Sequence, residues 1–189
     1  MNLYVRNLQE LQRFPTVISN IFVGIILCNA KENSILVIQE SDKQHSRFPG
    51  GGVEASDDYK GILSDLKQKG LLRDIGGFLN TLKHAAKREL KEELALDIDE
   101  AQLTFVCGLL TEDQEGEGRH LKVFLKYPLP ENFVPSLDVP SVEAERLIDF
   151  HFIKTTYDPA RQFLHLDPFL LLSRDHFYAL LQGAKNGKL

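Results

Sequence analysis

Cysteine and tryptophan are rare in this chain, and each absence limits the classes of protein to which it can belong. Among 189 residues there is no tryptophan and there are only two cysteines, Cys28 and Cys107. Both lie inside apolar runs and lack C-x-x-C spacing, which is typical of buried thiols in a reducing compartment. The longest apolar run, residues 21–28, is far shorter than the roughly 18 residues of a membrane-spanning helix. No secretory signal pattern opens the sequence. We therefore expect a cytoplasmic protein that does not cross a membrane.

A large positive charge is also missing. The chain carries 22 Lys and Arg residues against 27 Asp and Glu residues, which gives a formal net charge of −5. This balance argues against a broad nucleic-acid-binding surface, so a polyanionic ligand would need cations gathered locally. The length and the 43% hydrophobic content are those of one ordinary globular domain, which we expect to span residues 1–189.

Hydrophobic periodicity predicts an α/β (α+β) fold in which helices pack on a mixed sheet. Residues 17–28 and 34–40 flank a polar turn and predict a hairpin of two buried strands. Apolar residues spaced by three and four predict two short helices within 58–79, then a third helix that begins after Asn80 or Thr81. This third helix is expected to end near residue 94. Further predicted elements are strands over 103–110, 120–127 and 147–153, and a last helix that starts at Asp167-Pro168 and runs to Leu181.

Three carboxylates share one side of the third predicted helix. At about 100° per residue, Glu89, Glu92 and Glu93 fall on one arc, while Leu90 and Leu94 form an apolar stripe for the core. Like charges on adjacent turns repel one another unless a cation lies among them. Mg²⁺ takes oxygen ligands and commonly bridges protein carboxylates and substrate phosphates. The pattern is therefore either a solvated acidic face or a site for a divalent cation.

A glycine-rich segment precedes this helix, and the two segments together resemble a known sequence motif. The segments FPGGGVE at 48–54 and AAKRELKEELAL at 85–96 resemble the sequence box of the Nudix hydrolases, G-x5-E-x7-R-E-U-x-E-E-x-G-U with U aliphatic. Arg88 and the three glutamates match the box. Asp57 stands where the box has Glu, and Ala95 where it has Gly. Counted from Gly51, the box arginine is expected at 65 but comes at 88, which indicates a helical insertion at about 58–80.

The resemblance implies a Nudix-like α/β/α sandwich and a Mg²⁺ or Mn²⁺ cofactor. The metal would be held by Glu89, Glu92, Glu93 and the Gly51 carbonyl, and Arg88 would orient the glutamates. An activated water would attack one phosphorus of a nucleotide or nucleoside-diphosphate derivative. The position of the general base varies within this family, and the candidates here are Glu89, Glu143 and Glu145. Candidate phosphate contacts are Arg47, Gly51, Gly52 and Arg119.

Other interpretations stay open on the sequence. The departures at Asp57 and Ala95 favour a Nudix-like ligand-binding module that has lost turnover, whereas the intact glutamates favour an enzyme. An isopentenyl-diphosphate isomerase would need a cysteine in a Cys-x-His-Pro context, which neither Cys28 nor Cys107 has. The apolar side chains of segment 58–80 could form a lid, pack on the domain's own flank or make a homodimer contact. Without tryptophan, Phe or Tyr would have to hold a nucleobase.

Overall fold

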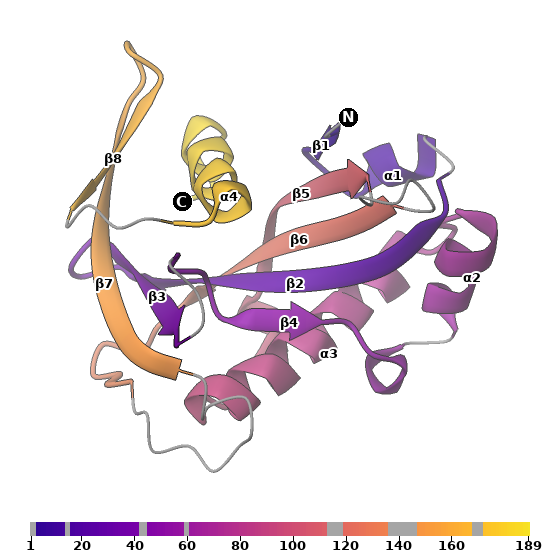
Figure 1. Cartoon of the computed structure of the whole chain (residues 1–189), viewed down its shortest axis with the longest axis horizontal. Helices are drawn as coiled ribbons and strands as arrows, with labels where there is room; N and C mark the ends of the chain where they lie inside the picture. Colours follow the sequence, from indigo (N-terminus) through magenta and orange to yellow (C-terminus); the bar gives the residue numbers. More distant parts are fainter. Residues whose placement is uncertain are drawn as a thin grey trace.

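The protein has one mixed sheet with helices on both faces (Figure 1). The computed structural model describes residues 3–13, 16–41, 45–58, 61–112, 119–135, 147–167 and 172–189. Within these parts the strands are β1 (Leu3–Val5), β2 (Ile18–Asn29), β3 (Ser34–Glu40), β4 (Gly50–Gly52), β5 (Thr104–Glu112), β6 (Arg119–Pro128), β7 (Leu147–Asp158) and β8 (Phe163–Asp167). The helices are α1 (Gln9–Arg13), α2 (Ile62–Lys69), α3 (Ile75–Leu94) and α4 (Arg174–Lys185), with 3₁₀ turns η1 (Ala55–Asp57) and η2 (Glu100–Gln102).

The strand β2 organises the sheet because it pairs with three other strands. It runs parallel to β6, while β3 and β4 pair antiparallel with two different parts of its other edge. The strand order is β1-β5-β6-β2-β3-β7-β8, with β4 beside β2. The predicted hairpin and the predicted strands over 103–110 and 120–127 are confirmed, and the mixed α/β sheet is the predicted fold class.

Alternate side chains of β2 pack into two separate cores. Ile21 and Val23 belong to the larger core with α3, whereas Ile26 belongs to the smaller core with α4. Figure 1 shows α3 and α4 on opposite sides of the sheet. Because side chains alternate along a strand, Phe22 and Gly24 share the face of Ile26. These two residues therefore lie on the α4 side.

The helix α3 is continuous over 20 residues and starts earlier than predicted. Asp74 caps it, because its side chain accepts a hydrogen bond of 2.9 Å from the Gly77 amide. The predicted start after Asn80 or Thr81 is wrong, since the buried stripe of the helix already includes Phe78 and continues without a break. Among the described residues, no helix is both long enough and apolar enough to cross a membrane.

The helix α2 packs on the flank of the sheet. It is the first of the two short helices predicted within 58–79, and it ends at Gly70, which has a left-handed conformation. The second predicted helix does not exist separately, because Leu71 and Leu72 are not helical and Ile75 already belongs to α3. Leu63 and Leu66 of α2 are buried in the same core as Phe78 of α3. The apolar side of this segment therefore faces the rest of the chain.

The end of the chain also differs from the prediction. Asp167 ends strand β8, which pairs with β7, and α4 begins only at Arg174. The helix start predicted at Asp167-Pro168 is wrong, because the preceding residues follow a two-residue period in which Leu164 and Leu166 are buried. The elements β1 and α1 were not predicted, since segments of three and five residues carry too little periodicity.

Ala95 provides a test of helix termination, because it ends α3 in a left-handed conformation with φ 51°. A β-carbon destabilises that conformation by about 1 kcal/mol. We expect Ala95→Gly to raise the free energy of unfolding by about 1 kcal/mol in urea titrations. Ala101→Gly is the matched control, because Ala101 is exposed and lacks a positive φ, and it should not stabilise the protein. Equal effects of the two substitutions would contradict this account.

Candidate active site

The glycine strand β4 lies directly against α3, and two of the predicted metal ligands are buried beneath it. A β-carbon added to Gly51 would lie 2.5 Å from Oε1 of Glu89, so the missing side chain makes room for this carboxylate. The Gly50 amide donates a hydrogen bond of 2.8 Å to Oε2 of Glu93. Glu89 and Glu93 are only 3% and 2% exposed. Both carboxylates are therefore stabilised by contacts with protein groups instead of by water.

Arg88 supplies the positive charge on the Glu89 side. Its guanidinium donates to both carboxylate oxygens of Asp57, at 3.2 and 3.0 Å, and to the Gly52 carbonyl at 2.8 Å. Its Nη1 lies 2.9 Å from Oε1 of Glu89 and 3.0 Å from Oε2 of Glu92. Arg88 thus contacts the carboxylates of Asp57, Glu89 and Glu92 at once. Asp57 is one methylene shorter than the glutamate of the box and still reaches the arginine.

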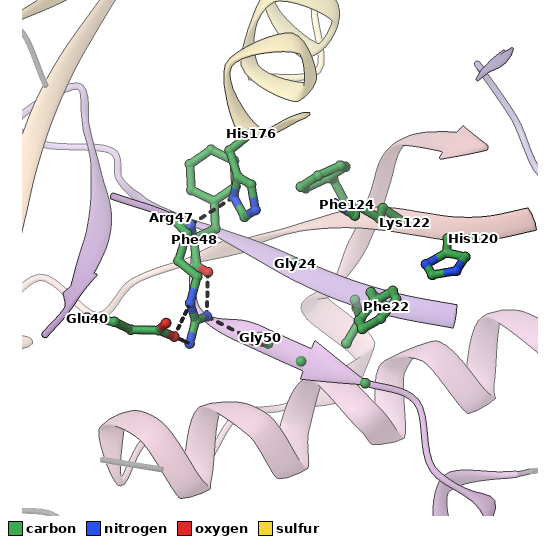
Figure 2. Close-up of a pocket in the computed structure, with 13 residues that line it drawn as sticks. Phe22, Gly24, Glu40, Arg47, Phe48, Gly50, His120, Lys122, Phe124 and His176 are labelled. Atoms are coloured by element: carbon green, nitrogen blue, oxygen red, sulfur yellow. Dashed lines mark hydrogen bonds and ion pairs between the residues drawn. The ribbon is translucent and has the colours of Figure 1, made fainter. Parts of the chain in front are cut away.

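Arg47 plays the same part for Glu93. Its Nη2 lies 2.5 Å from Oε1 of Glu93, and its Nε donates a hydrogen bond of 2.6 Å to Oε1 of Glu40. The remaining Nη1 donates to the carbonyls of Phe48 and Gly50, at 3.0 and 2.9 Å (Figure 2). Arg47 thus joins the end of β3 to β4 and to α3. Its donors face protein oxygens in this structure, although the sequence predicts a phosphate contact for it.

Both arginines keep their charge in spite of their burial. Burial by itself would lower the pKa of Arg47 and of Arg88, but the neighbouring carboxylates outweigh it and each pKa is raised. The two guanidinium groups therefore stay cationic and balance Glu89 and Glu93. Removing one partner of a buried ion pair leaves an uncompensated charge, which typically costs 3–5 kcal/mol of stability. The charged residues around β4 therefore depend on one another for stability.

The oxygen donors suit a hard divalent cation in type. Glu89, Glu92, Glu93 and the Gly51 carbonyl offer only oxygen, which is what Mg²⁺ and Mn²⁺ prefer. Glu89 and Glu92 already share one cationic group, Nη1 of Arg88, so the structure accommodates positive charge between them. Among the residues that the structure describes, no three His, Cys, Asp or Glu side chains converge as a metal-binding group. To bind a metal, the glutamate oxygens would have to turn toward a common point.

A cavity of about 410 Å³ opens beside β4 on the α4 side of the sheet (Figure 2). All three glycines of β4 line it, together with Val23 and Gly24 of β2. Phe22 stacks on His120 with ring centroids 6.0 Å apart. A cavity of this size, with aromatic walls and a few polar groups, is typical of small-molecule binding sites. The larger side chains around it are Phe22, Phe48, His120, Lys122, Phe124 and His176.

His176 enters the cavity from α4 and holds the segment that leads into β4. Its Nδ1 accepts a hydrogen bond of 2.9 Å from the Phe48 amide. Its ring centroid lies 4.8 Å from that of Phe48 and 5.3 Å from that of Phe124. Burial, and then the positive charges of Arg47 and Lys122, lower the pKa of His176 to about 3. The imidazole is therefore neutral at physiological pH.

The structure brings together most of the predicted site residues. Those that meet around β4 and α3 are Arg47, Gly51, Gly52, Arg88, Glu89, Glu92 and Glu93. Arg119 lies apart at the start of β6, where its Nη1 is 3.4 Å from Oγ1 of Thr16, and it does not line the cavity. Glu143 and Glu145 fall outside the described residues, so their role as general base stays a prediction.

The sequence does not predict that Phe22, Phe124 and His176 line one cavity. His120, Lys122 and Phe124 alternate along β6, as Phe22 and Gly24 do along β2, and this two-residue period is a usable signal. The parallel pairing of β2 with β6 then brings the two sets to one face. For the histidine of α4 there is no comparable signal, because its place depends on how that helix docks.

Several solved structures with a similar fold are Nudix proteins. A MutT/nudix family protein from Enterococcus faecalis matches with a TM-score of 0.59 and 15% identity, over 88% of this chain and 61% of that one. The NUDIX domain of Shewanella oneidensis NrtR, solved with ADP ribose, matches with a TM-score of 0.53 and 14% identity, over 94% and 92%. The E. coli dihydroneopterin triphosphate pyrophosphohydrolase matches with a TM-score of 0.51 and 18% identity, over 88% and 96%. This chain has the Nudix fold.

The likeness to Nudix proteins is found in the structure and not in the overall sequence. No family model matches the chain, and a search of curated proteins finds no significant match. The chain spans 61% of the length of the Enterococcus faecalis protein. The α/β/α sandwich that the box resemblance implied is confirmed, with α3 and α4 on opposite faces of the sheet.

Neighbouring glycines of β4 test how closely Glu89 approaches the strand. A β-carbon at Gly51 would lie 2.5 Å from Glu89, whereas one at Gly52 would have nothing within 4 Å. We expect Gly51→Ala to lower the free energy of unfolding by about 1–3 kcal/mol through overpacking, and Gly52→Ala to leave it within about 0.5 kcal/mol. Urea unfolding of the two variants measures this. Matching midpoints would show that the carboxylate does not occupy this position.

The neutral His176 makes a pH-dependent contribution to stability. With a pKa of about 3 in the folded protein against an ordinary value of 6.5, the ring takes up a proton on unfolding between these two pH values. Stability is therefore lost as the pH falls through this window, by about 1.4 kcal/mol per pH unit. We expect the difference in unfolding free energy between wild type and His176→Asn to change by about this slope between pH 4.5 and 5.5. A difference that does not vary with pH would refute a neutral buried His176.

Proposed function

We propose that this protein is a Nudix hydrolase that cleaves the diphosphate linkage of a nucleotide or nucleoside-diphosphate derivative, with Mg²⁺ or Mn²⁺ as its cofactor. The observation that carries the proposal is the position of β4. Its glycines line the aromatic cavity and also contact the glutamates of α3. A nucleotide whose base lies among the aromatic rings can extend its phosphates along backbone that has no side chains in the way.

The box residues of α3 would carry the chemistry. Glu89, Glu92, Glu93 and the Gly51 carbonyl would hold the metal, which when bound neutralises phosphate oxygens and lowers the pKa of a water molecule. Arg88 positions Glu89 and Glu92 through its Nη1. Glu89 is the described glutamate that lies against Gly51, so we assign it as the general base that takes the proton of the attacking water. Its carboxylate is held by Arg88, which keeps it aimed at the strand.

A second function is a ligand-binding module without turnover. The observation in its favour is that arginines engage all three glutamates of the box. A Nudix domain of similar structure, that of Shewanella oneidensis NrtR, was solved with ADP ribose bound. Such a module would use the same cavity. It would not need the glutamate oxygens to converge on a metal ion.

Hydrolysis assays separate these two functions. The panel comprises nucleoside triphosphates, ADP ribose, dinucleotide polyphosphates, NADH and coenzyme A, each with Mg²⁺, with Mn²⁺ and with EDTA. We expect metal-dependent release of phosphate, pyrophosphate or nucleoside monophosphate from at least one class. Glu89→Gln keeps the shape of the side chain and removes its charge, and it should lower kcat by about 10²–10⁴-fold. Glu131→Gln is the control, because Glu131 is exposed and outside the site.

Each other outcome of these assays has a definite meaning. No turnover of any compound, together with binding of one of them in calorimetry, would establish the binding module. Turnover that persists in EDTA would overturn the assignment of a metal cofactor. Full activity of Glu89→Gln would refute Glu89 as the base and leave Glu143 and Glu145 as the candidates.

We further propose that residues 1–189 form one domain whose box is interrupted by the segment at about 58–80. Burial of Leu63 and Leu66 in the core of the sheet supports this organisation. A cytoplasmic location is supported by the two free thiols, Cys28 and Cys107, since a reducing compartment keeps such cysteines unpaired.

A further inference from the structure

The aromatic side chains of the cavity form two groups that differ in exposure. Phe48 and Phe124 are only 0% and 2% exposed, and their ring centroids lie 4.8 and 5.3 Å from that of His176. Phe22 and His120, which stack on each other, are both partly exposed. The rings of the first group therefore pack against one another, whereas the second group has ring surface available to a ligand.

The space above the strands differs in the same way. The ring of Phe124 covers Gly24, because a β-carbon added to Gly24 would lie 3.0 Å from it. A β-carbon added to Gly52 would meet none of the described residues within 4 Å. The β-carbon position of Gly51 points to Glu89 on the α3 side, so that of Gly52, the next residue, points to the opposite side, where the cavity lies. The cavity is therefore open over Gly52.

Strand pairing places this open space beside Phe22. In the antiparallel pair of β2 and β4, Phe22 lies opposite Gly52, and both residues line the cavity. Figure 2 shows the rings of Phe22 and His120 next to each other, on the side of the view away from His176. A flat group laid against the Phe22 ring would fill the space over Gly52.

We infer that Phe22, with His120 stacked beside it, is the platform for the base of the substrate, and that the base lies over Gly52. This inference rests on the proposed function, since it concerns the substrate of the same site. Stacking uses the π-face that every base has, so such a platform accepts different bases. It does not stabilise a diphosphate that lacks an aromatic ring. The cavity therefore selects nucleotides as a class and discriminates only weakly among their bases.

A tryptophan reporter tests the stacking directly, because the chain has no tryptophan of its own. Phe22→Trp keeps an aromatic ring on the platform. Phe163→Trp is the matched control, because Phe163 of β8 is 58% exposed and does not line the cavity. The nucleotides are ATP, GTP, cytidine triphosphate and ADP ribose, and the probes without a base are tripolyphosphate and ribose 5-phosphate. Each is titrated in EDTA and with Mg²⁺.

We expect the nucleotides, and not the probes without a base, to quench the emission of Phe22→Trp. None of these compounds should quench Phe163→Trp. Adding Gly52→Leu to Phe22→Trp should remove the quenching, because the new side chain would occupy the space over the strand. Calorimetry on Phe22→Leu, which keeps apolar surface and loses the π-face, should show the Kd of the nucleotides rising about tenfold more than that of the probes without a base.

The contrary results are equally clear. Absence of quenching by any nucleotide in Phe22→Trp would overturn the inference, and so would quenching that survives Gly52→Leu. Equal loss of affinity for nucleotides and for probes without a base in Phe22→Leu would do the same. Quenching by nucleotides without hydrolysis of any of them would support the platform and refute the proposed hydrolase. Hydrolysis with a KM that Phe22→Leu does not raise would do the opposite. Thermal unfolding verifies that each variant is folded.

Discussion

Two buried carboxylates beneath a strand of glycines are the constraint on which the rest of this site depends. Glu89 and Glu93 approach β4 closely, and each is neutralised by an arginine from a different direction. Arg47 connects β3 and β4 to α3, and Arg88 connects η1 and β4 to the same helix. A buried charge without a partner would be far too costly, so these elements must be placed together.

This constraint also explains why the cavity can lie next to the glutamates of α3. The backbone of β4 forms a wall of the aromatic cavity, and Gly51 lies against the carboxylate of Glu89. A strand with ordinary side chains could not approach both the helix and a ligand so closely. His176 of α4 lines the same cavity and accepts a hydrogen bond from the Phe48 amide. One short strand thus links the ligand to the glutamates.

Local sequence signals predict part of this correctly. The hairpin of β2 and β3, the strands β5 and β6 and the acidic arc of α3 follow from periodicity and charge, which act over a few residues. The errors come from competing local signals. Asn80 and Thr81 are good caps, but the apolar stripe from Phe78 onward lets α3 begin at Asp74 instead. At the other end, Asp167 and Pro168 resemble a helix start, yet pairing with β7 extends a strand to Asp167.

By itself the sequence determined which residues carry charge on one helix arc, which glycines lie before them and that the likeness is to the Nudix box. Tertiary structure alone decided which distant residues meet those charges. Arg47 meets Glu93 across 46 positions of the chain, and His176 meets Phe48 across 128. Contacts of such separation depend on strand pairing and helix docking, which sum many weak interactions over the whole sheet. No local pattern encodes them, and they shape the cavity.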